Sequence, residues 1–218
     1  MKTALVFGSS GLVGSHLLDL IIKGSNYDKV KLFVRLVPTI INSKIEIIKT
    51  DFNNLQNHKD SFVGDDCFFC IGTTRKNTPD KKEYIRIEYN LPLKVAKIAR
   101  ENSIKSFTYI SSLGANPNAS GLYLKNKGQT EEGLKKLNFS KLSIMRPSIL
   151  LGNRKENRIG EKIGIFVMKS LSPLFLGKMK KYKPIRVESV AKAMLNIAEN
   201  KYEKTIFESD NIEEISNL

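Results

Sequence analysis

Residues 3–14 read TALVFGSSGLVG, and this stretch decides the fold. Its first five residues predict a short buried strand, and the apolar positions after Gly11 predict an amphipathic helix. Three glycines, Gly8, Gly11 and Gly14, stand three residues apart at the junction. A tight turn needs glycine for backbone angles that other residues avoid, and glycine lets the backbone come close to a pyrophosphate.

This glycine-rich turn predicts a dinucleotide site. Free N–H groups and the positive end of the helix dipole attract phosphate at a helix start. The spacing differs from GxGxxG, and a plain strand-to-helix turn is the structural alternative, although such a turn rarely needs three glycines in seven residues. The expected contacts to the cofactor are Gly8, Ser10, Gly11, Leu12, Val13 and Gly14.

The end of the second predicted strand, residues 30–34, bears on the choice between NAD and NADP. An acidic residue roughly 20 positions after the glycines would bind the ribose 2′-hydroxyl of NAD. Here Arg35 is the only charged side chain, and a guanidinium binds a 2′-phosphate through a charge-assisted fork. We expect NADP(H) as the cofactor, with NAD(H) as the alternative. If Arg35 does not bind the cofactor, it is an ordinary surface arginine at the end of a strand.

Short apolar strands alternate with helices over the first 150 residues. The expected strands are 3–7, 30–34, 45–48, 67–71, 107–111 and 142–146. The expected helices begin near residue 12, span 79–102 with Pro92 bending or opening the helix, and span 122–137. Because strands without polar alternation are covered on both faces, we predict an α/β fold with a doubly wound parallel sheet, the Rossmann fold.

The alternation weakens after residue 150. A helix at 163–170, a strand at 185–187 and a helix at 189–200 are expected there. Residues 151–218 are too few for a separate substrate domain. We therefore predict a single NAD(P)-binding domain over 1–218, in which 151–218 form a small C-terminal cap over the substrate.

Composition narrows the cellular context. Two cysteines and two histidines make neither a disulfide framework nor a four-ligand zinc site, so no metal is expected. Cys67 and Cys70 form a CxxC, but residues three apart on a strand point to opposite faces, which favours core packing over redox chemistry. No apolar run approaches the roughly 20 residues that span a bilayer. A cytoplasmic protein without a membrane partner is expected.

Basic residues are concentrated in one segment. The chain has 36 Lys and Arg against 22 Asp and Glu, a net charge of +14, and the segment 154–186 contributes +8 of it. Three interpretations compete: a solvated lysine surface, a pocket wall that attracts an anionic substrate or the cofactor phosphates, and nucleic-acid binding. Nucleic acid is disfavoured because lysine greatly outnumbers arginine and aromatic residues are not interleaved.

Tyr123 and Lys127 lie four residues apart on a predicted helix and share one face. An ammonium close to a phenol favours the phenolate, which suits a general acid/base for a carbonyl/alcohol pair. The pattern alone carries little weight, since Tyr27 and Lys31 match it by chance, and a surface pair is the alternative. The preceding strand ends in Ser111-Ser112, where a hydroxyl can bind the reacting oxygen.

Together these motifs resemble the short-chain dehydrogenase/reductase family, in its atypical branch of extended type, over about residues 1–200. The resemblance rests on the glycine turn, Tyr-Ile-Ser-Ser at 109–112, Tyr123 to Lys127, and Arg-Pro-Ser-Ile-Leu-Leu-Gly at 146–152. Residues 70–75 and 122–124 are most similar to the oxidoreductase group that includes the Tat-interacting protein.

The resemblance implies a set of functional residues. It places the catalytic serine at Ser112, the tyrosine at Tyr123 and the lysine at Lys127, the last two also touching the cofactor. The family's usual asparagine on the long helix has no clear match, since Glu88 falls near that place. The further cofactor contacts that it implies are Asp51, Phe52, Gly72, Thr73, Pro147, Ser148 and Ile149.

The resemblance also implies a reaction: hydride transfer between nicotinamide C4 and a carbon of a small carbonyl or alcohol substrate. Tyr123 would donate the proton, Ser112 would hold the oxygen, and Lys127 would orient the ribose and tune the phenol. A non-catalytic NADP(H)-binding sensor that acts through protein partners is the alternative from a different class. Both a monomer and a homodimer fit these expectations.

Overall fold

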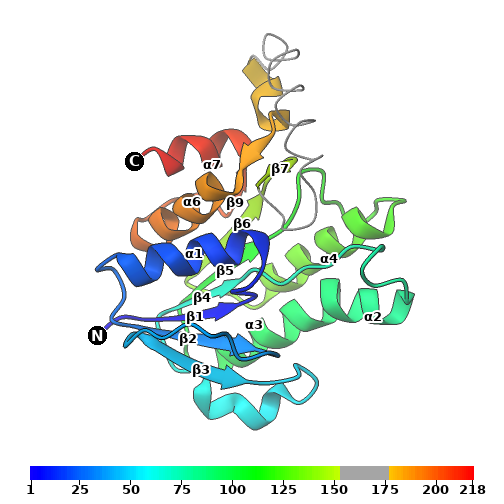
Figure 1. Ribbon diagram of the computed structural model, residues 1–218. Coiled ribbons are helices and arrows are strands. Elements are labelled where there is room, and N and C mark those ends of the chain that lie inside the picture. The colour runs from blue at the N-terminus through cyan, green and yellow to red at the C-terminus, as the bar shows by residue number, and fades with distance from the viewer. Residues whose placement is uncertain (153–176) are drawn as a thin grey trace.

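A computed structural model describes residues 1–152 and 177–218 of the chain. The predicted helix at 163–170 and most of the basic segment 154–186 lie outside the described residues. Seven strands form one sheet in the order β3-β2-β1-β4-β5-β6-β9 (Figure 1). This order reverses direction between β1 and β4, where open α/β sheets bind their ligands.

The strands are short, and every pairing within this sheet is parallel. Phe7 at the end of β1 pairs with Phe33 of β2 on one side and Phe69 of β4 on the other. The predicted doubly wound parallel sheet is therefore confirmed. The strand bounds are β1 Thr3–Phe7, β2 Lys29–Val34, β3 Ile45–Lys49, β4 Asp66–Phe69, β5 Ser106–Ile110, β6 Lys141–Arg146 and β9 Ile206–Glu208.

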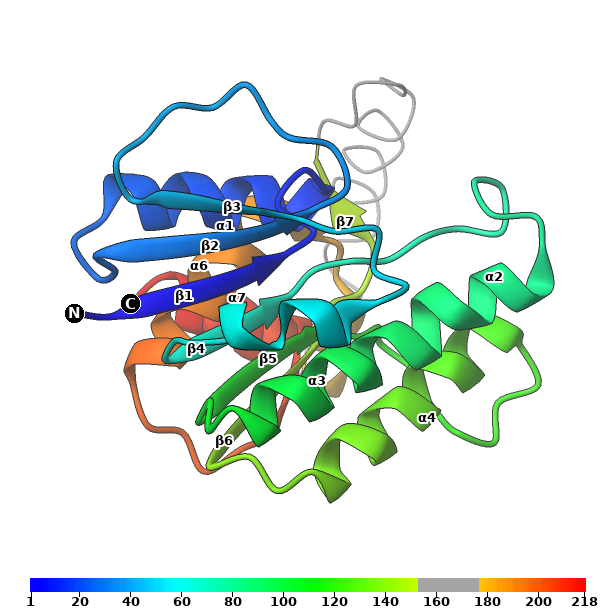
Figure 2. The ribbon, with the colours of Figure 1, turned by 90° about the horizontal axis from the view of Figure 1, so that it is seen from below.

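Helices cover both faces of the sheet (Figures 1 and 2). One face carries α1 (Leu12–Lys23), α6 (Val187–Glu199) and α7 (Ser209–Ser216); the other carries α3 (Leu91–Glu101) and α4 (Leu122–Lys136). Consecutive residues of β1 enter different cores: Val6 packs under α1 and α6, whereas Phe7 packs under α3. A strand buried on both faces needs this uniformly apolar sequence.

The helix predicted at 79–102 is divided into three parts. The segments α2 (Lys81–Ile85) and α3 flank a π-helical turn, η2 (Arg86–Asn90). Pro92 has no N–H, so the carbonyl four residues earlier, that of Glu88, lacks its α-helical donor. The hydroxyl of Thr130 on α4 donates to that carbonyl at 3.1 Å. The opening expected from Pro92 is thus found one turn upstream of it.

The C-terminal region departs from prediction at several elements. The strand β9 and the helix α7 are not apparent from the sequence, because a three-residue strand and a two-turn helix show too little periodicity. The expected strand at 185–187 and helix at 189–200 are found as β8 (Ile185–Arg186) and α6, but β8 pairs with an unexpected strand, β7 (Leu150–Leu151), outside the main sheet. A 3₁₀ helix, η4 (Gly177–Tyr182), precedes β8 in the chain, and another, η1 (Leu55–Ser61), follows β3. The cap over 151–218 stays a prediction.

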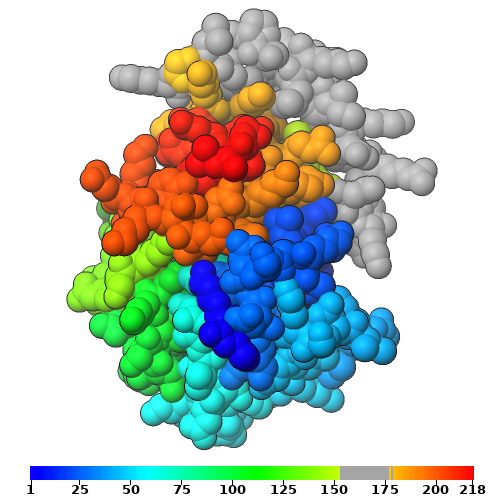
Figure 3. Space-filling view, turned by 90° about the vertical axis from the view of Figure 1, so that its left-hand side faces the viewer, coloured from blue at the N-terminus to red at the C-terminus, as the bar shows by residue number. Residues whose placement is uncertain are grey.

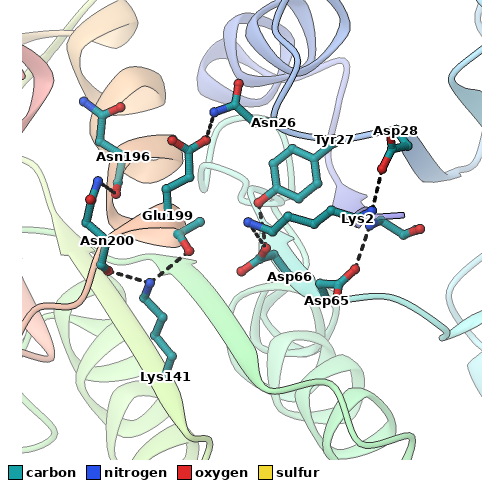
Figure 4. Close-up of polar contacts among 12 residues, drawn as sticks. Lys2, Asn26, Tyr27, Asp28, Asp65, Asp66, Lys141, Asn196, Glu199 and Asn200 are labelled. Atoms are coloured by element: carbon teal, nitrogen blue, oxygen red, sulfur yellow. Dashed lines mark hydrogen bonds and ion pairs between the residues drawn. The ribbon is translucent and has the colours of Figure 1, made fainter.

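Polar contacts close the amino end of the sheet (Figure 4). The Lys2 N–H donates to the Asp28 carboxylate at 2.6 Å. Buried Asp66 accepts a hydrogen bond from the Tyr27 hydroxyl at 2.7 Å and lies 3.0 Å from the Lys2 Nζ. Figure 3 faces this end and shows the first residues, in dark blue, on the surface. None of the helices within residues 1–152 and 177–218 has both the length and the hydropathy of a membrane span.

Candidate cofactor and catalytic site

The glycine-rich turn joins β1 to α1 at the point where the strand order reverses. Gly8 has a φ of +86°, and a Cβ on it would lie 2.8 Å from the backbone carbon of Cys70. A Cβ on Gly14 would lie 2.1 Å from the Gly8 oxygen. Only glycine fits at both positions, so the turn is as tight as the sequence predicts, and it packs against the end of β4.

The amino end of α1 suits an anion. Gly11 is the N-cap, no side chain caps the helix, and its first turn contains no acidic residue. Ser10 is exposed, Leu12 is half-buried and Val13 is buried, so the backbone is what this turn offers a ligand. Uncapped N–H groups and the helix dipole together favour phosphate. The residues present therefore fit the pyrophosphate of a dinucleotide.

Arg35 follows β2 with its side chain exposed. The guanidinium of Arg86, 2.6 Å from the Glu83 carboxylate, and the more distant charge of Arg35 hold the pKa of Glu83 below its usual value. Arg86 forms the ion pair with this carboxylate, and Arg35 acts on it only from a longer distance. Among the described residues no carboxylate pairs with Arg35, as the sequence-based hypothesis of 2′-phosphate binding requires.

The turn after β3 is strained. Phe52 has a φ of +66°, in the left-handed region that non-glycine residues avoid, and its ring is buried 6.4 Å from that of Phe7. The exposed Asp51 carboxylate accepts the Asn53 N–H at 2.9 Å, and this hydrogen bond holds the pKa of Asp51 below its usual value. Asp51 is therefore accessible to a ligand, whereas the Phe52 ring serves the core.

Gly72 and Thr73 follow β4, and Glu88 reaches them from η2. One carboxylate oxygen of Glu88 accepts the Thr73 N–H at 2.5 Å, and a Cβ on Gly72 would lie 3.3 Å from the same oxygen. The other oxygen lies 3.0 Å from Lys127 Nζ, with both side chains almost fully buried. Sequence reasoning did not assign Glu88 a role; the only signal was its place where the family has asparagine.

Lys127 is buried on α4 between the sheet and η2. Its ammonium donates to the Ile110 carbonyl at 3.0 Å, pairs with Glu88, and lies 4.9 Å from the Tyr109 ring centroid. Burial penalises the charged form, but the oxygens of Tyr109, Glu88 and Tyr123 outweigh that penalty, so the pKa of Lys127 is raised above its usual value. Of the three donors of this ammonium, one is used by the Ile110 carbonyl, and the Glu88 carboxylate supplies the counter-charge.

Tyr123, one turn before Lys127, remains open to solvent. Its side chain is 43% exposed, and Lys127 Nζ lies 5.9 Å from its ring centroid. The predicted shared face of the pair is therefore present on α4. The loop before the helix folds back onto it, since the Asn116 N–H donates to the Leu124 carbonyl at 3.1 Å. This contact holds the segment after β5 beside the first turn of α4.

The two serines that end the β5 segment differ sharply. The buried Ser111 hydroxyl donates to Glu131 at 2.5 Å, and Glu131 in turn binds the Arg146 guanidinium through both oxygens. The half-buried Ser112 hydroxyl has a long contact of 3.4 Å to the neighbouring Leu113 carbonyl. Of the two hydroxyls, that of Ser112 is the one left for a substrate.

The segment after β6 lies beside the Ser112 loop. The Leu113 N–H donates to the Pro147 carbonyl at 2.9 Å, and the Ser148 N–H donates to the Ser209 hydroxyl at 2.8 Å. The Ile149 side chain is 64% exposed. Most of the predicted cofactor residues thus follow the carboxyl ends of β1 to β6, whereas Tyr123 and Lys127 lie on α4, which follows β5 in the chain.

The cysteines and potential metal ligands do not form a further centre in the described part of the chain. Cys67 and Cys70 are free thiols that pack into different hydrophobic cores, as predicted for a strand. Burial raises the pKa of the Cys70 thiol to about 12. No group of three His, Cys, Asp or Glu side chains could hold a metal ion within residues 1–152 and 177–218.

Comparison with known proteins confirms the cofactor class. Residues 8–201 match a family described as NAD(P)H-binding. The chain is 32% identical over 211 residues to "Protein FMP52-1, mitochondrial" of Scheffersomyces stipitis, covering 93% of this chain and 90% of that protein. It is 32% identical over 199 residues to "Protein HTATIP2" of Rattus norvegicus, covering 89% and 80%. The resemblance to an atypical short-chain dehydrogenase/reductase is therefore confirmed.

Solved structures agree on the fold. The ADP-L-glycero-D-manno-heptose-6-epimerase of Helicobacter pylori superposes with a TM-score of 0.69 at 17% identity, over 99% of this chain and 81% of that one. At this identity the likeness shows the fold alone.

The expected cytoplasmic location is wrong by these comparisons. The relatives from Scheffersomyces stipitis, Candida albicans and Emericella nidulans are all named as mitochondrial proteins. The inference failed because a low cysteine count reports a reducing compartment and does not distinguish among the compartments that are reducing.

Proposed function

The chain belongs to the NAD(P)H-binding family, and from this premise we propose that it is an NADP(H)-dependent oxidoreductase for a small carbonyl or alcohol substrate. The observation that carries the proposal is the Tyr123–Lys127 pair, in which an exposed phenol stands beside a buried, charged ammonium. When bound, NADP(H) gives or accepts a hydride at nicotinamide C4.

Three side chains carry the proton chemistry in this proposal. In the reducing direction, the Tyr123 hydroxyl donates its proton to the carbonyl oxygen as negative charge develops there. The Ser112 hydroxyl donates a hydrogen bond to the same oxygen. Lys127 keeps a positive charge near the resulting phenolate, and its ammonium would also hold the cofactor ribose. In the oxidising direction the phenolate accepts the proton instead.

The cofactor contacts in this proposal follow the carboxyl edge of the sheet. The backbone of the glycine turn, residues 8–14, binds the pyrophosphate, and Arg35 binds the 2′-phosphate. Asp51 and the backbone of Phe52 lie at the adenine end, Gly72–Thr73 lie along the dinucleotide, and residues 147–149 lie beside the nicotinamide.

The direct test combines binding and turnover on the wild-type protein. NADPH should raise the melting temperature, because a ligand that binds only the folded state stabilises it. NADPH oxidation should then appear with at least one class in a panel of aldehydes, ketones and quinones. A protein that NADPH does not stabilise would contradict the cofactor assignment, and one that binds NADPH but reduces nothing would contradict the enzyme.

A second candidate is a non-catalytic NADP(H)-binding regulator that acts through a protein partner. The observation that favours it is that the relatives above, "Protein FMP52-1, mitochondrial" and "Protein HTATIP2", carry no enzymatic activity in their names. Binding without turnover in the same panel would support this candidate over the oxidoreductase.

A further inference from the structure

Glu88 joins two parts of the candidate site through one carboxylate. Its Oε1 accepts the Thr73 N–H at 2.5 Å, and its Oε2 lies 3.0 Å from Lys127 Nζ. The side chain is 1% exposed. A carboxylate that is withdrawn from water needs a counter-charge and hydrogen bonds. Oε1 is hydrogen-bonded, and Oε2 has the ammonium as its counter-charge but accepts no hydrogen bond from the described residues.

The local backbone explains why Glu88 points into the site. It occupies the middle of the π-helical turn η2, which shifts the side-chain positions relative to an α-helix. Pro92 withholds the α-helical donor from the Glu88 carbonyl, and the buried Thr130 hydroxyl supplies a donor from α4. The same helix that carries Lys127 therefore anchors both the backbone and the side chain of Glu88.

Glu88 is the only carboxylate that forms an ion pair with Lys127 among the described residues. A lysine buried without a counter-charge loses its proton near neutral pH, because burial disfavours the ammonium. The other titratable groups that face the pair are Tyr109 on β5, Tyr84 on α2 and Tyr123 on α4, with Arg75 over the Tyr84 ring. Glu88 is the only carboxylate in this set, which otherwise consists of phenols and one arginine. The asparagine usual in the family would supply no charge.

We propose that Glu88 is a positioning residue that keeps Lys127 charged and ties it to the Gly72–Thr73 turn, so that ribose binding and proton transfer use a preset ammonium. This inference rests on the proposed function. The inference adds one property to the proposed function: Glu88 makes the affinity for NADPH independent of pH, because the Lys127 ammonium does not titrate in the neutral range.

The test measures NADPH dissociation constants by titration of the full chain between about pH 7 and pH 9. In this range the Lys127 ammonium of the wild type should keep its proton. The wild type should show a flat profile. The Glu88→Gln substitution keeps the shape of the side chain but removes its negative charge, so Lys127 should lose its proton between about pH 7 and pH 9. NADPH affinity should then fall at least about tenfold toward pH 9, as expected for a lost charge-assisted hydrogen bond. The matched control is Glu101→Gln, at the exposed end of α3, which should stay flat.

Two further measurements separate positioning from a purely structural role. The double variant Glu88→Gln with Lys127→Met should bind NADPH weakly at every pH, because the titrating group is gone. In amide spectra of the cofactor-free protein, the Thr73 N–H should move upfield in Glu88→Gln, since a carboxylate acceptor is replaced by a weaker amide. If Glu88→Gln does not fold, Glu88→Asp keeps the charge and should retain the flat profile with weaker binding.

A flat Glu88→Gln profile with an unmoved Thr73 resonance would overturn the inference, as would a pH dependence that persists without Lys127. None of these readouts involves turnover. A wild-type protein that binds NADPH but reduces nothing therefore overturns the oxidoreductase and leaves the role of Glu88 to be judged on binding alone.

Discussion

The two ends of the sheet each hold a tyrosine, a carboxylate and a lysine, but they pair them differently. At the amino end, Asp66 serves both partners: it accepts the Tyr27 hydroxyl at 2.7 Å and lies 3.0 Å from Lys2 Nζ (Figure 4). At the carboxyl end, Glu88 serves only Lys127 and a backbone N–H, and Tyr123 is left exposed.

This difference separates a structural set from a candidate reactive one. Burial, and then the adjacent Asp66, raise the pKa of Tyr27 far above its usual value, so this phenol stays neutral and inert. Tyr123 has solvent access beside an ammonium whose charge is already balanced. The residue types are the same at both ends, so the pattern of pairing, and not the composition, distinguishes the end for which we propose a reaction.

A surface cavity of about 270 Å³ lies at the amino end and sharpens the contrast. It is lined by residues of β6, the end of α4 and the turn before β9, including Lys141, Tyr202 and Thr205. Lys141 Nζ is held by the carbonyls of Ala198 and Asn200 at 2.9 and 2.7 Å (Figure 4). None of the residues predicted to bind the cofactor lines this cavity.

The largest expected effect tests the carboxyl end. Tyr123→Phe removes the proton donor and should lower turnover about 10²–10⁴-fold, the usual contribution of a general acid/base. NADPH affinity should remain near that of the wild type, because the ring and Lys127 stay in place. Steady-state kinetics and NADPH titration check both halves. A loss of affinity as large as the loss of rate would make Tyr123 a binding residue and would erase the distinction between the two ends.

The next effect tests the amino end. Asp66→Leu leaves the buried Tyr27 hydroxyl without its acceptor and Lys2 without its counter-ion, so the free energy of unfolding should fall by about 2–3 kcal/mol. Urea denaturation measures the loss. NADPH affinity of the folded variant should be unchanged, and a clear change would mean that the two ends are coupled.

A smaller effect concerns cofactor choice at the carboxyl end. Arg35→Ser should weaken NADPH about 10- to 100-fold, the size of a lost charge-assisted contact, and should leave NADH binding unaltered. Isothermal titration with both cofactors provides the measurement. Lys105→Ser, which removes an exposed charge at the amino end, is the matched control. Wild-type NADH binding as tight as that of NADPH would refute the preference.

The smallest effect is a pH dependence at the amino end. The pKa of Tyr27 is raised on folding, so its contribution is fully present below the unfolded pKa of about 10 and is lost as pH rises above it. Tyr27→Phe should cost about 1 kcal/mol at neutral pH. The variant should also lose less stability than the wild type between neutral pH and strongly alkaline pH. Equal alkaline losses in urea denaturation would show that Tyr27 ionises freely in the fold.

Much of the fold could be predicted because its signals are local. The apolar run before Gly8 and the spacing of Gly8, Gly11 and Gly14 specify a strand, a tight turn and a helix without reference to distant residues. Pro92 likewise predicts an irregular helix, and the π-helical turn η2 is found before it. The strand β9 could not be predicted, because three residues show no detectable hydrophobic periodicity. Its pairing with β6 is determined by tertiary packing.

The candidate site also has features that follow from local sequence and features that depend on tertiary contacts. Its residue types and their order along the chain, from the glycine turn to Tyr123 and Lys127, follow from the sequence, since consecutive parallel strands bring their carboxyl ends to one edge. The hydrogen bond of Ser111 to Glu131, the pairing of Lys127 with Glu88 and the inert state of Tyr27 depend on contacts between residues 15 to 42 positions apart or in neighbouring strands and helices. No local pattern encodes such pairings, because which polar groups satisfy one another is settled only when the layers pack and water is excluded.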